Sequence, residues 1–302
     1  MENISPIVWQ EKLSDKMRVR LRKKALNIKP SYYDQGLYTA CFTSDHIGAS
    51  TIIYGQYEHN FLHALFNNIL KDEKNNFESS TALDVGANIG GHTCYFSKFF
   101  NRVIAFEPSP LPRHICNANV LANKLEDRVF IEPVGLGNKD EQLSFSPYKD
   151  NDLGKGSFSN FGHLDEKDLK EMPTLDVRIG DKIIEKKYAQ DEISFIKLDI
   201  EGFELFALQG LENTIKKHKP FIVFESSGAT KEEYSGQAIV DFLKRFGYSS
   251  FFSIERAKKP KIKFLRKIYN QIVREKLFIT NIEEVQAYRR YDMIIASCKN
   301  IS

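Results

Sequence analysis

The stretch TALDVGANIGGHT, residues 81–93, decides the fold of this chain. A short, mostly apolar run ends at Asp84 and Val85, glycines follow, and a helical pattern begins near Ile89. This order predicts a buried strand, a tight turn and the start of a helix. In open parallel sheets, ligands bind beyond the carboxyl ends of the strands, so we expect a site for a nucleotide-type ligand at this turn.

The acid at the end of this strand narrows the choice of ligand. Asp84 precedes the glycines, where a carboxylate would repel the pyrophosphate of a dinucleotide. The spacing from Gly86 to Gly90 is G-x-x-x-G rather than the dinucleotide pattern G-x-G-x-x-G. A cofactor with a cationic amino-acid end suits the carboxylate, and S-adenosylmethionine (SAM) is such a cofactor. The glycines could serve the turn alone, but the strand before them and the helix after them favour a cofactor site.

A second acid stands at the end of the next predicted strand. The run RVIAFEP, residues 102–108, predicts a strand that ends at Glu107. In a βαβ unit the acid at the end of the second strand reaches the ribose hydroxyls of a nucleotide. A single glutamate at a strand end is usually a solvated loop residue, but its distance from Asp84 favours the ribose role for Glu107.

The elements alternate through the middle of the chain, which predicts an α/β fold. We expect a Rossmann-like, doubly wound, mostly parallel seven-stranded sheet with helices on both faces, plus N-terminal and internal additions. The seven sheet strands are expected at 81–85, 102–107, 128–134, 193–199, 220–226, 248–254 and 291–297. Helices are expected at 59–70, 89–100, 111–124, 203–217 and 231–246, and extra short strands within 38–53 and at 142–145 and 174–179.

Four ionisable side chains crowd the end of the fourth core strand, in SFIKLDIEGFE, residues 194–204. Side chains alternate along a strand, so Lys197 and Asp199 should share a face. A lysine beside carboxylates holds them in place and lowers their pKa values. Glu201 and Glu204 could instead cap the following helix as surface acids. We favour a functional role for Asp199, at the very end of an apolar strand.

Taken together, three motifs give the chain a specific resemblance. DVGANIG at 84–90, FEP at 106–108 and KLDIEGFE at 197–204 resemble the FkbM family of SAM-dependent methyltransferases, over about residues 55–227. The resemblance implies a class I methyltransferase that methylates oxygen, often a sugar hydroxyl of a glycan, glycolipid or glycosylated natural product. A saccharide or glycoconjugate is therefore the expected acceptor.

The resemblance also implies roles for individual residues. The methionine end of SAM would lie along Asp84, Gly86, Asn88 and Gly90, and the ribose would lie at Glu107. The turn at 134–138 would lie near the adenine, and the loop at 154–159, with Ser157, would cover the acceptor. The full expected cofactor set is Asp84, Gly86, Ala87, Asn88, Gly90, Thr93, Glu107, Pro108 and Asp199.

Methyl transfer to a sugar hydroxyl needs alignment and removal of a proton. We expect Asp199 to act as the base or to orient the acceptor, and Lys197 to fix Asp199 and stabilise negative charge on oxygen. Glu201 and Glu204 complete the expected catalytic set, and Glu225 is expected to contact the acceptor. A divalent cation on Asp199 and Glu225 is the alternative, and we favour the metal-free reaction.

Composition sets the remaining limits. The 302 residues carry a net charge of +3, which does not require a nucleic-acid partner. The four cysteines, Cys41, Cys94, Cys116 and Cys298, make no metal or disulfide pattern. We expect Cys94 and Cys116 to be buried free thiols, and the compartment to be reducing. We see neither a signal peptide nor a membrane span, and expect a cytoplasmic, bacterial protein.

Two basic segments flank the expected core. We expect an N-terminal extension over 1–54, with a charged helix at 12–24, and a methyltransferase domain over 55–302 with a basic insertion at about 255–285. Between Glu255 and Lys276 there are nine Lys or Arg residues and two acids. An amphipathic helix over 255–280 would contact the inner surface of an anionic membrane or a partner, or simply pack on the domain.

Three other functions fit parts of the sequence. The basic segments would suit a nucleic-acid methyltransferase, but the small net charge does not favour one. A hydride-transferring oxidoreductase conflicts with Asp84 and with the glycine spacing. A non-catalytic adaptor with a SAM-binding fold conflicts with the presence of Asp84, Glu107, Lys197 and Asp199 together.

Overall fold

The computed structural model describes residues 37–42, 46–145, 172–226, 235–256, 277–286 and 289–299. The expected helix at 12–24, the loop at 154–159 with Ser157, and residues 257–276 of the basic segment lie outside the described residues.

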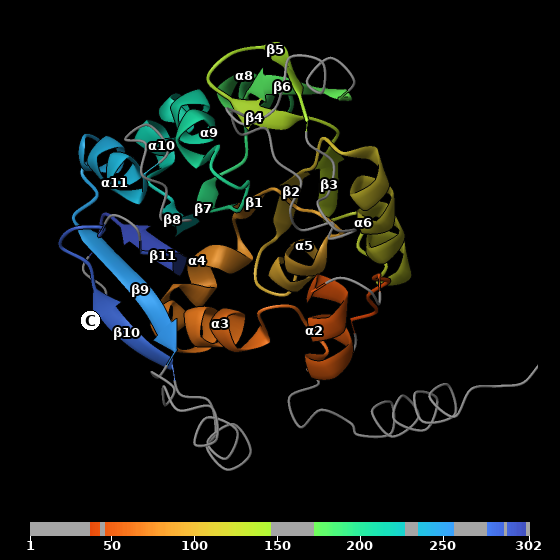
Figure 1. Ribbon diagram of the computed structural model, residues 1–302, viewed down its shortest axis with the longest axis horizontal. Helices are drawn as coiled ribbons and strands as arrows, with labels where there is room; N and C mark the ends of the chain where they lie inside the picture. The colour runs from red at the N-terminus through yellow and green to blue at the C-terminus, as the bar shows by residue number, and fades with distance from the viewer. Residues whose placement is uncertain are drawn as a thin grey trace, which may run out of the picture.

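The core is a mixed eight-stranded sheet in the order β10-β9-β11-β8-β7-β1-β2-β3 (Figure 1). Five neighbouring strands from β3 to β8 pair in parallel, and β11, β9 and β10 pair antiparallel at one edge. The α/β class with a mostly parallel sheet is thus confirmed. The bounds are β1 (Thr81–Val85), β2 (Arg102–Phe106), β3 (Val129–Glu132), β7 (Ile193–Leu198), β8 (Phe221–Ser226), β9 (Ser250–Arg256), β10 (Leu277–Asn281) and β11 (Tyr291–Ser297).

The prediction of seven strands was wrong by one. The eighth strand is β10, which pairs with β9 from Leu277 opposite Arg256 to Asn281 opposite Phe252. We expected the end of a basic amphipathic helix there. The β-branched residues Ile279 and Thr280 instead favour a strand, and β9 offers an edge for them to pair with.

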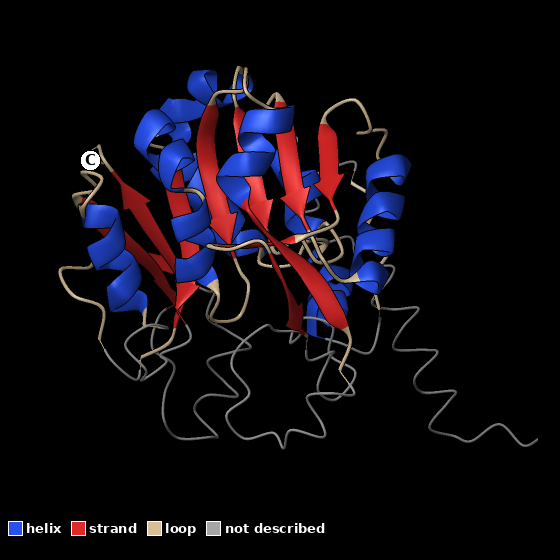
Figure 2. Ribbon diagram, turned by 90° about the horizontal axis from the view of Figure 1, so that it is seen from above, coloured by secondary structure: helices blue, strands red, loops and turns tan. Residues whose placement is uncertain are grey.

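Helices cover both faces of the sheet (Figure 2). One face packs against α8 (Gly180–Lys187), α9 (Glu204–Gly210), α10 (Glu212–His218) and α11 (Gly236–Lys244). The other packs against α3 (His59–Ala64), the π-helical η1 (Leu65–Ile69), α4 (Lys74–Glu78), α5 (Gly91–Phe96) and α6 (Pro110–Ala122), with η2 (Lys71–Glu73) between η1 and α4. Within β1, Leu83 and Val85 belong to the first core and Ala82 to the second, as strand alternation requires.

An aromatic cluster supports the helices behind the glycine turn. Phe66 of η1 stacks on Phe99 with ring centroids 4.4 Å apart and contacts Phe96 and Phe195. Phe77 contacts Phe195 from α4. Truncating one such buried ring to alanine costs about 3–5 kcal/mol, so this cluster fixes α5 against β7.

A second, three-stranded sheet lies over α9, in the order β4-β6-β5. It consists of β4 (Gly135–Gly137), β5 (Glu141–Ser144) and β6 (Thr174–Ile179). We expected a turn at 134–138, but residues 135–137 of this segment form the short edge strand β4. A Cβ atom on Gly210 would lie 2.0 Å from the Gly137 carbonyl oxygen, so only glycine lets α9 approach β4 this closely.

Three other expectations about secondary structure were wrong. Residues 46–54 form a helix, α2 (His46–Tyr54), where we expected a strand, because the β-branched run Thr51-Ile52-Ile53 favoured an extended chain. Residues 37–42 contain no strand, although the Tyr38 and Ala40 amides donate to the side chains of Asn123 and Asn119. The single helix expected at 203–217 is two helices, divided at Leu211.

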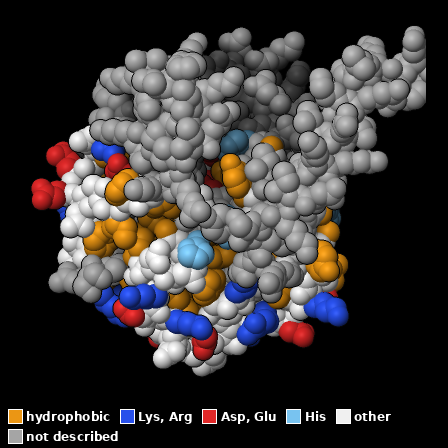
Figure 3. Space-filling view, turned by 90° about the horizontal axis from the view of Figure 1, so that it is seen from below, with side chains coloured by type: hydrophobic (Ala, Val, Ile, Leu, Met, Phe, Trp, Pro, Cys, Tyr) orange, Lys and Arg blue, Asp and Glu red, His pale blue; other side chains and the backbone are white. Residues whose placement is uncertain are grey.

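The described surface has a mixed character. In Figure 3, Lys or Arg side chains and Asp or Glu side chains lie near one another along the lower edge, with hydrophobic groups between them.

Cys94 and Cys116 are buried free thiols, as expected. Within the described ranges, no helix is both long enough and apolar enough to cross a bilayer.

Candidate active site

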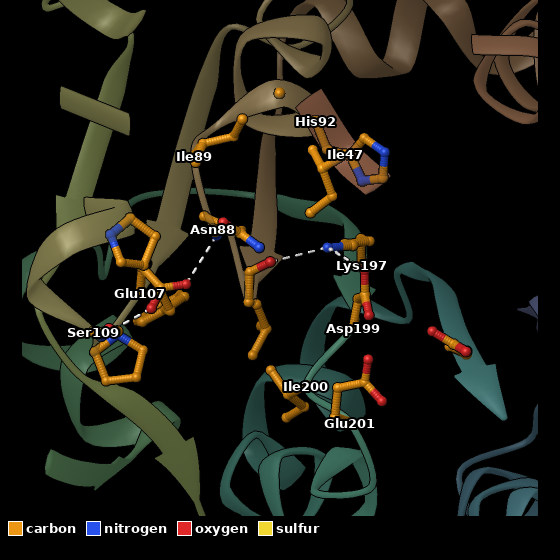
Figure 4. A pocket seen from close by; sticks show the side chains of 18 of the residues that line it. Ile47, Asn88, Ile89, His92, Glu107, Ser109, Lys197, Asp199, Ile200 and Glu201 are labelled. Atoms are coloured by element: carbon orange, nitrogen blue, oxygen red, sulfur yellow. Dashed lines mark hydrogen bonds and ion pairs between the residues drawn. The ribbon is translucent and has the colours of Figure 1, made fainter. Parts of the chain in front are cut away.

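A cavity of about 470 Å³ opens at the carboxyl ends of β1, β2 and β7 (Figure 4). This volume is within the range of small-molecule sites. Figure 4 shows Asn88 and Glu107 on one side of the cavity, and Lys197 and Asp199 on the other. Its lining combines the loop after β1, the ends of β2 and β7, residues of α2 and the 55–58 turn, and Arg290 before β11.

The glycine loop is built around left-handed backbone conformations. Gly86 has φ +82°, and a Cβ there would lie 2.1 Å from the Asp199 carbonyl oxygen. Asn88 has φ +51°, which asparagine adopts more readily than most residues. Gly90 has φ +80°, and its Cβ would meet Cys116 Sγ at 2.5 Å. The glycines thus let the β1 loop touch both the β7 loop and α6.

Glu107 joins two loops at the end of β2. Its Oε2 accepts from the Asn88 amide at 2.9 Å, and its Oε1 accepts from the Ser109 amide at 2.8 Å. Burial raises the pKa of Glu107 to about 7, although both amides favour the charged form. Each carboxylate oxygen has a second lone pair, so Glu107 can accept further hydrogen bonds from a ligand in the cavity.

Lys197 lies between two carboxylates. Its Nζ is 3.3 Å from Asp84 Oδ1 and 3.4 Å from Asp199 Oδ2, and it donates to the Gly86 carbonyl at 3.1 Å. Burial opposes the charged form of Lys197, but Asp84 and Asp199 outweigh it and raise its pKa. Burial likewise opposes the charged form of Asp199, but Lys197 and His92 outweigh it and lower its pKa. Asp199 is therefore an ionised hydrogen-bond acceptor at neutral pH.

Three acids converge beside this pair. Asp199, Glu201 and Glu225 each offer an oxygen, and these oxygens lie within 4.8 Å of one another. Burial and Asp199 raise the pKa of Glu225 to about 8. Arg290 Nη2 lies 2.5 Å from Glu225 Oε1. Oxygen sets of this kind bind Mg²⁺ or Ca²⁺, but Lys197 and Arg290 already balance two of the three acids.

The structure brings most of the expected site residues to the cavity, but not all of them. Gly86, Ala87, Asn88, Glu107, Pro108, Lys197, Asp199, Glu201 and Glu225 line it. Asp84, which is completely buried, lies behind the lining, where Thr93 Oγ1 donates to its Oδ2 at 2.6 Å. Gly90 packs on Cys116, and Ser157 lies outside the described residues.

Glu204 also lies behind the lining. Its Oε1 accepts from the amides of Ile200 and Gly202, both at 3.1 Å. Burial raises its pKa to about 7. Glu204 therefore holds the loop after β7 in shape, and this geometry gives it a positioning role rather than contact with reacting atoms.

Sequence reasoning missed several residues of the lining. Tyr57 and His92 form one wall, and their rings stack with centroids 5.8 Å apart. Arg290, at the far end of the chain, reaches the cavity through its ion pair with Glu225. His92 stands two residues after Gly90, so the glycine motif itself was the available signal. The sequence carried no comparable signal for Tyr57 or Arg290.

Comparison with known families identifies the domain. The methyltransferase FkbM domain family matches residues 84–250, more than half of the chain. This chain belongs to the FkbM methyltransferase family. The matched methyltransferase domain contains Asp84, Glu107, Lys197, Asp199 and Glu225.

Individual relatives of this FkbM methyltransferase are distant. The hexuronic acid methyltransferase AglP of Haloferax volcanii is 28% identical over 148 residues, 49% of this chain and 56% of AglP. The chain thus spans about half the length of that curated relative. The crystal structure of methyltransferase FkbM from Methylobacillus flagellatus KT is 18% identical with a TM-score of 0.42, covering 73% of this chain and 44% of that one. An O-methyltransferase from Bacillus cereus in complex with SAH is 12% identical with a TM-score of 0.38, covering 97% and 94%.

The cavity of this FkbM methyltransferase extends beyond the matched domain. His46, Ile47, Thr51 and Tyr57 line it from α2 and the turn after α2, and Arg290 lines it from the segment before β11. These residues precede or follow the matched range 84–250. The parts of the chain outside the matched range therefore complete one wall of the cavity.

Proposed function

We propose that this FkbM methyltransferase transfers a methyl group from SAM to a hydroxyl group of a saccharide. One observation carries the proposal. Glu107 at the end of β2 and the Lys197–Asp199 pair at the end of β7 line the same cavity, on either side of the glycine loop. A nucleoside at Glu107 would therefore extend along the glycine loop toward Asp199.

The residues present fit SAM. Each carboxylate oxygen of Glu107 accepts one hydrogen bond from a loop amide, of Asn88 or of Ser109, and keeps a second lone pair for a ribose hydroxyl. Gly135 and Leu136 also line the cavity, and we propose that the adenine would lie near them. When bound, SAM supplies an electrophilic methyl group on a sulfonium. The chain's own residues must align the acceptor and accept its proton.

Asp199 is the proposed proton acceptor. The acceptor oxygen forms a bond to the methyl carbon as the carbon–sulfur bond breaks, and that bond's electron pair stays on sulfur. The hydroxyl proton passes to an Asp199 carboxylate oxygen. Lys197 holds that carboxylate at 3.4 Å and keeps it ionised, so Asp199 can accept a proton at neutral pH. Glu201 and Glu225 are proposed to orient the acceptor from the same side.

The charge of the lining favours a neutral acceptor. Four carboxyl groups, those of Glu107, Asp199, Glu201 and Glu225, line the cavity together with the cations Lys197 and Arg290. Both cations are already paired with acids. Among the described lining residues, neither cation is therefore free to bind a carboxylate on the saccharide. We therefore propose a neutral sugar hydroxyl, although the distant relative AglP is named for a hexuronic acid.

A methyl-transfer assay tests the proposal. The purified chain is mixed with SAM carrying a labelled methyl group and with neutral methyl glycosides, methyl uronates, glycolipids or RNA, each with and without EDTA. We expect label in a neutral saccharide, independent of EDTA, and a fall of about 10²–10⁴-fold in Asp199→Asn. Asp140→Asn, in a surface pair with Lys182, is the matched control. Labelling of RNA alone, or full activity in Asp199→Asn, would overturn it.

A further inference from the structure

Tyr57 lines the cavity from the turn that follows α2, outside the matched range 84–250. Its ring stacks on His92 with an interplanar angle of 22° and meets His46 edge-on at 87°, with ring centroids 5.8 Å apart in both pairs. Both histidines also line the cavity, and Figure 4 shows His92 on the Lys197 side of it. These two ring contacts restrict how the Tyr57 ring can turn, so the chain itself sets the position of its hydroxyl.

The Tyr57 hydroxyl is a neutral hydrogen-bond donor. Burial raises its pKa, so it keeps its hydrogen at neutral pH. The charges of Glu58, Asp199 and Glu225 raise this pKa further, whereas the charge of Arg290 lowers it. Interactions of this kind weaken with distance, so Tyr57 lies near the acids at the ends of β7 and β8, on the side of the cavity proposed to hold the acceptor. Within the described ranges, this hydroxyl donates to no other group.

The acids on this side of the cavity can accept hydrogen bonds from a sugar, but a sugar also needs donors. Asp199, Glu201 and Glu225 offer oxygens within 4.8 Å of one another, so two neighbouring sugar hydroxyls can each donate to a different carboxylate. Each hydroxyl oxygen also has lone pairs that accept hydrogen bonds. The cationic donors Lys197 and Arg290 are already paired with acids. A proton on Glu225 is engaged as well, because Glu225 hydrogen-bonds to Asp199. A neutral donor on the adjacent wall therefore completes the hydrogen bonds of a bound sugar.

We propose that the Tyr57 hydroxyl donates a hydrogen bond to the sugar oxygen next to the one that is methylated, and that the acceptor is therefore a vicinal diol. This assignment rests on the proposed function and narrows its acceptor from any neutral sugar hydroxyl to one with a neighbouring hydroxyl. It also makes Tyr57 a substrate-binding residue that the chain supplies from outside the matched domain.

The reaction itself distinguishes the two oxygens of such a diol. The reacting oxygen gives its hydrogen to Asp199 and attacks the methyl carbon with a lone pair, so a donor on that oxygen would weaken the attack. The neighbouring oxygen forms no new covalent bond and can accept from Tyr57 throughout the reaction. Its own hydrogen can go to Glu201 or Glu225, which lie beside Asp199. Tyr57 thus orients the sugar and takes no part in the proton transfer.

Steady-state methyl transfer with two tyrosine variants tests the assignment. Tyr57→Phe removes the hydroxyl and keeps the ring that contacts His46 and His92. Tyr54→Phe is the matched control, because Tyr54 is 55% exposed at the end of α2 and lies outside the described cavity lining. The probes are the methyl glycosides of glucose, galactose and mannose. The one that wild type labels most is compared with its monodeoxy derivatives, each lacking one hydroxyl next to the methylated position. Affinity for S-adenosylhomocysteine (SAH) is measured by calorimetry in parallel.

We expect Tyr57→Phe to raise the KM for the glycoside roughly 3- to 10-fold, as for loss of one hydrogen bond between neutral groups. Because this contact is the same before and during the reaction, kcat should stay within about twofold of wild type. SAH affinity should not change, and Tyr54→Phe should match wild type throughout. With one of the monodeoxy glycosides the effect of Tyr57→Phe should disappear, because the partner oxygen is already absent.

Three results would overturn the assignment. An unchanged KM in Tyr57→Phe would show that the hydroxyl does not bind the sugar. The same increase with the parent glycoside and with every monodeoxy derivative would show that Tyr57 acts through the shape of the wall. A matching loss of SAH affinity would place Tyr57 at the cofactor. Failure of wild type to label any of the three glycosides is a different result, because it removes the proposed neutral sugar acceptor itself, and the Tyr57 contact with it.

Discussion

Lys197 and Asp84 form a buried ion pair, with 3.3 Å between Nζ and Oδ1, at the centre of the parallel sheet. Asp84 is 0% exposed and Lys197 is 7% exposed. The two strands that carry them, β1 and β7, are paired with Asp84 opposite Lys197. The register of β1 and β7 therefore places the Lys197 ammonium between the carboxylates of Asp84 and Asp199.

Removing the lysine should leave Asp84 buried and unpaired. We expect Lys197→Met to lower the free energy of unfolding by about 3–5 kcal/mol, measured by urea denaturation. Lys182→Met removes the exposed partner of Asp140 and should cost less than about 1 kcal/mol. Equal losses in the two variants would show that the Lys197–Asp84 pair contributes no more than a surface pair.

Alanine substitutions at two glycines, Gly86 and Gly247, distinguish the cost of a left-handed backbone from the cost of a steric clash. Gly86 and Gly247 have nearly the same φ, +82° and +85°, but only Gly86 has a neighbour where a Cβ would lie, the Asp199 carbonyl at 2.1 Å. Gly247→Ala should cost about 1–2 kcal/mol from its left-handed backbone alone. Gly86→Ala should cost several kcal/mol more and abolish SAH binding. Similar melting temperatures for the two variants would contradict the close contact between the β1 and β7 loops.

The affinity for SAH should depend on pH through Glu107. Burial raises its pKa to about 7, so the carboxylate that would accept from ribose hydroxyls forms as the pH rises through 7. We expect SAH to bind more tightly at pH 8 than at pH 6, and we expect Glu107→Gln to bind weakly with a flatter dependence. Tighter binding at pH 6 in wild type would argue against a ribose contact at Glu107.

Stability should depend on pH through Glu204. Its folded-state pKa, about 7, lies above its ordinary value of 4.5 because the group is buried. The folded chain therefore keeps a proton that the unfolded chain has lost, and this contribution declines as the pH rises from about 4.5 to 7. Relative to Glu204→Gln, wild type should lose on the order of 3 kcal/mol between pH 4.5 and 8. A constant difference between the two across that range would show that Glu204 does not titrate there.

The sequence motifs predicted the central strands and the loops that follow them, because these features depend on residues close together in sequence. The run before Gly86 and the run before Glu107 are buried strands, and the alternation of strands and helices implies a parallel sheet. The approach of Lys197 to Asp199 also follows from strand alternation. These features depend on neighbouring residues in sequence or on a strand order that the fold class fixes.

The rest depended on contacts between distant segments. Tyr57 and Arg290 reach the cavity from opposite ends of the chain, and no local pattern reports that meeting. The position of Asp84 at a strand end suggested contact with a ligand. The sequence did not show that Thr93 and Lys197 enclose its carboxylate. The strand β10 was missed because, although its β-branched residues favour a strand, its pairing depends on the edge that β9 offers, which no local pattern shows.

The most direct test of the central claim is a crystal structure of the chain with SAH. We predict that SAH lies in the cavity between the glycine loop and the end of β7, with its ribose hydroxyls on Glu107 and its sulfur directed toward Asp199. Nucleoside bound anywhere else, or with its ribose away from Glu107, would contradict the account.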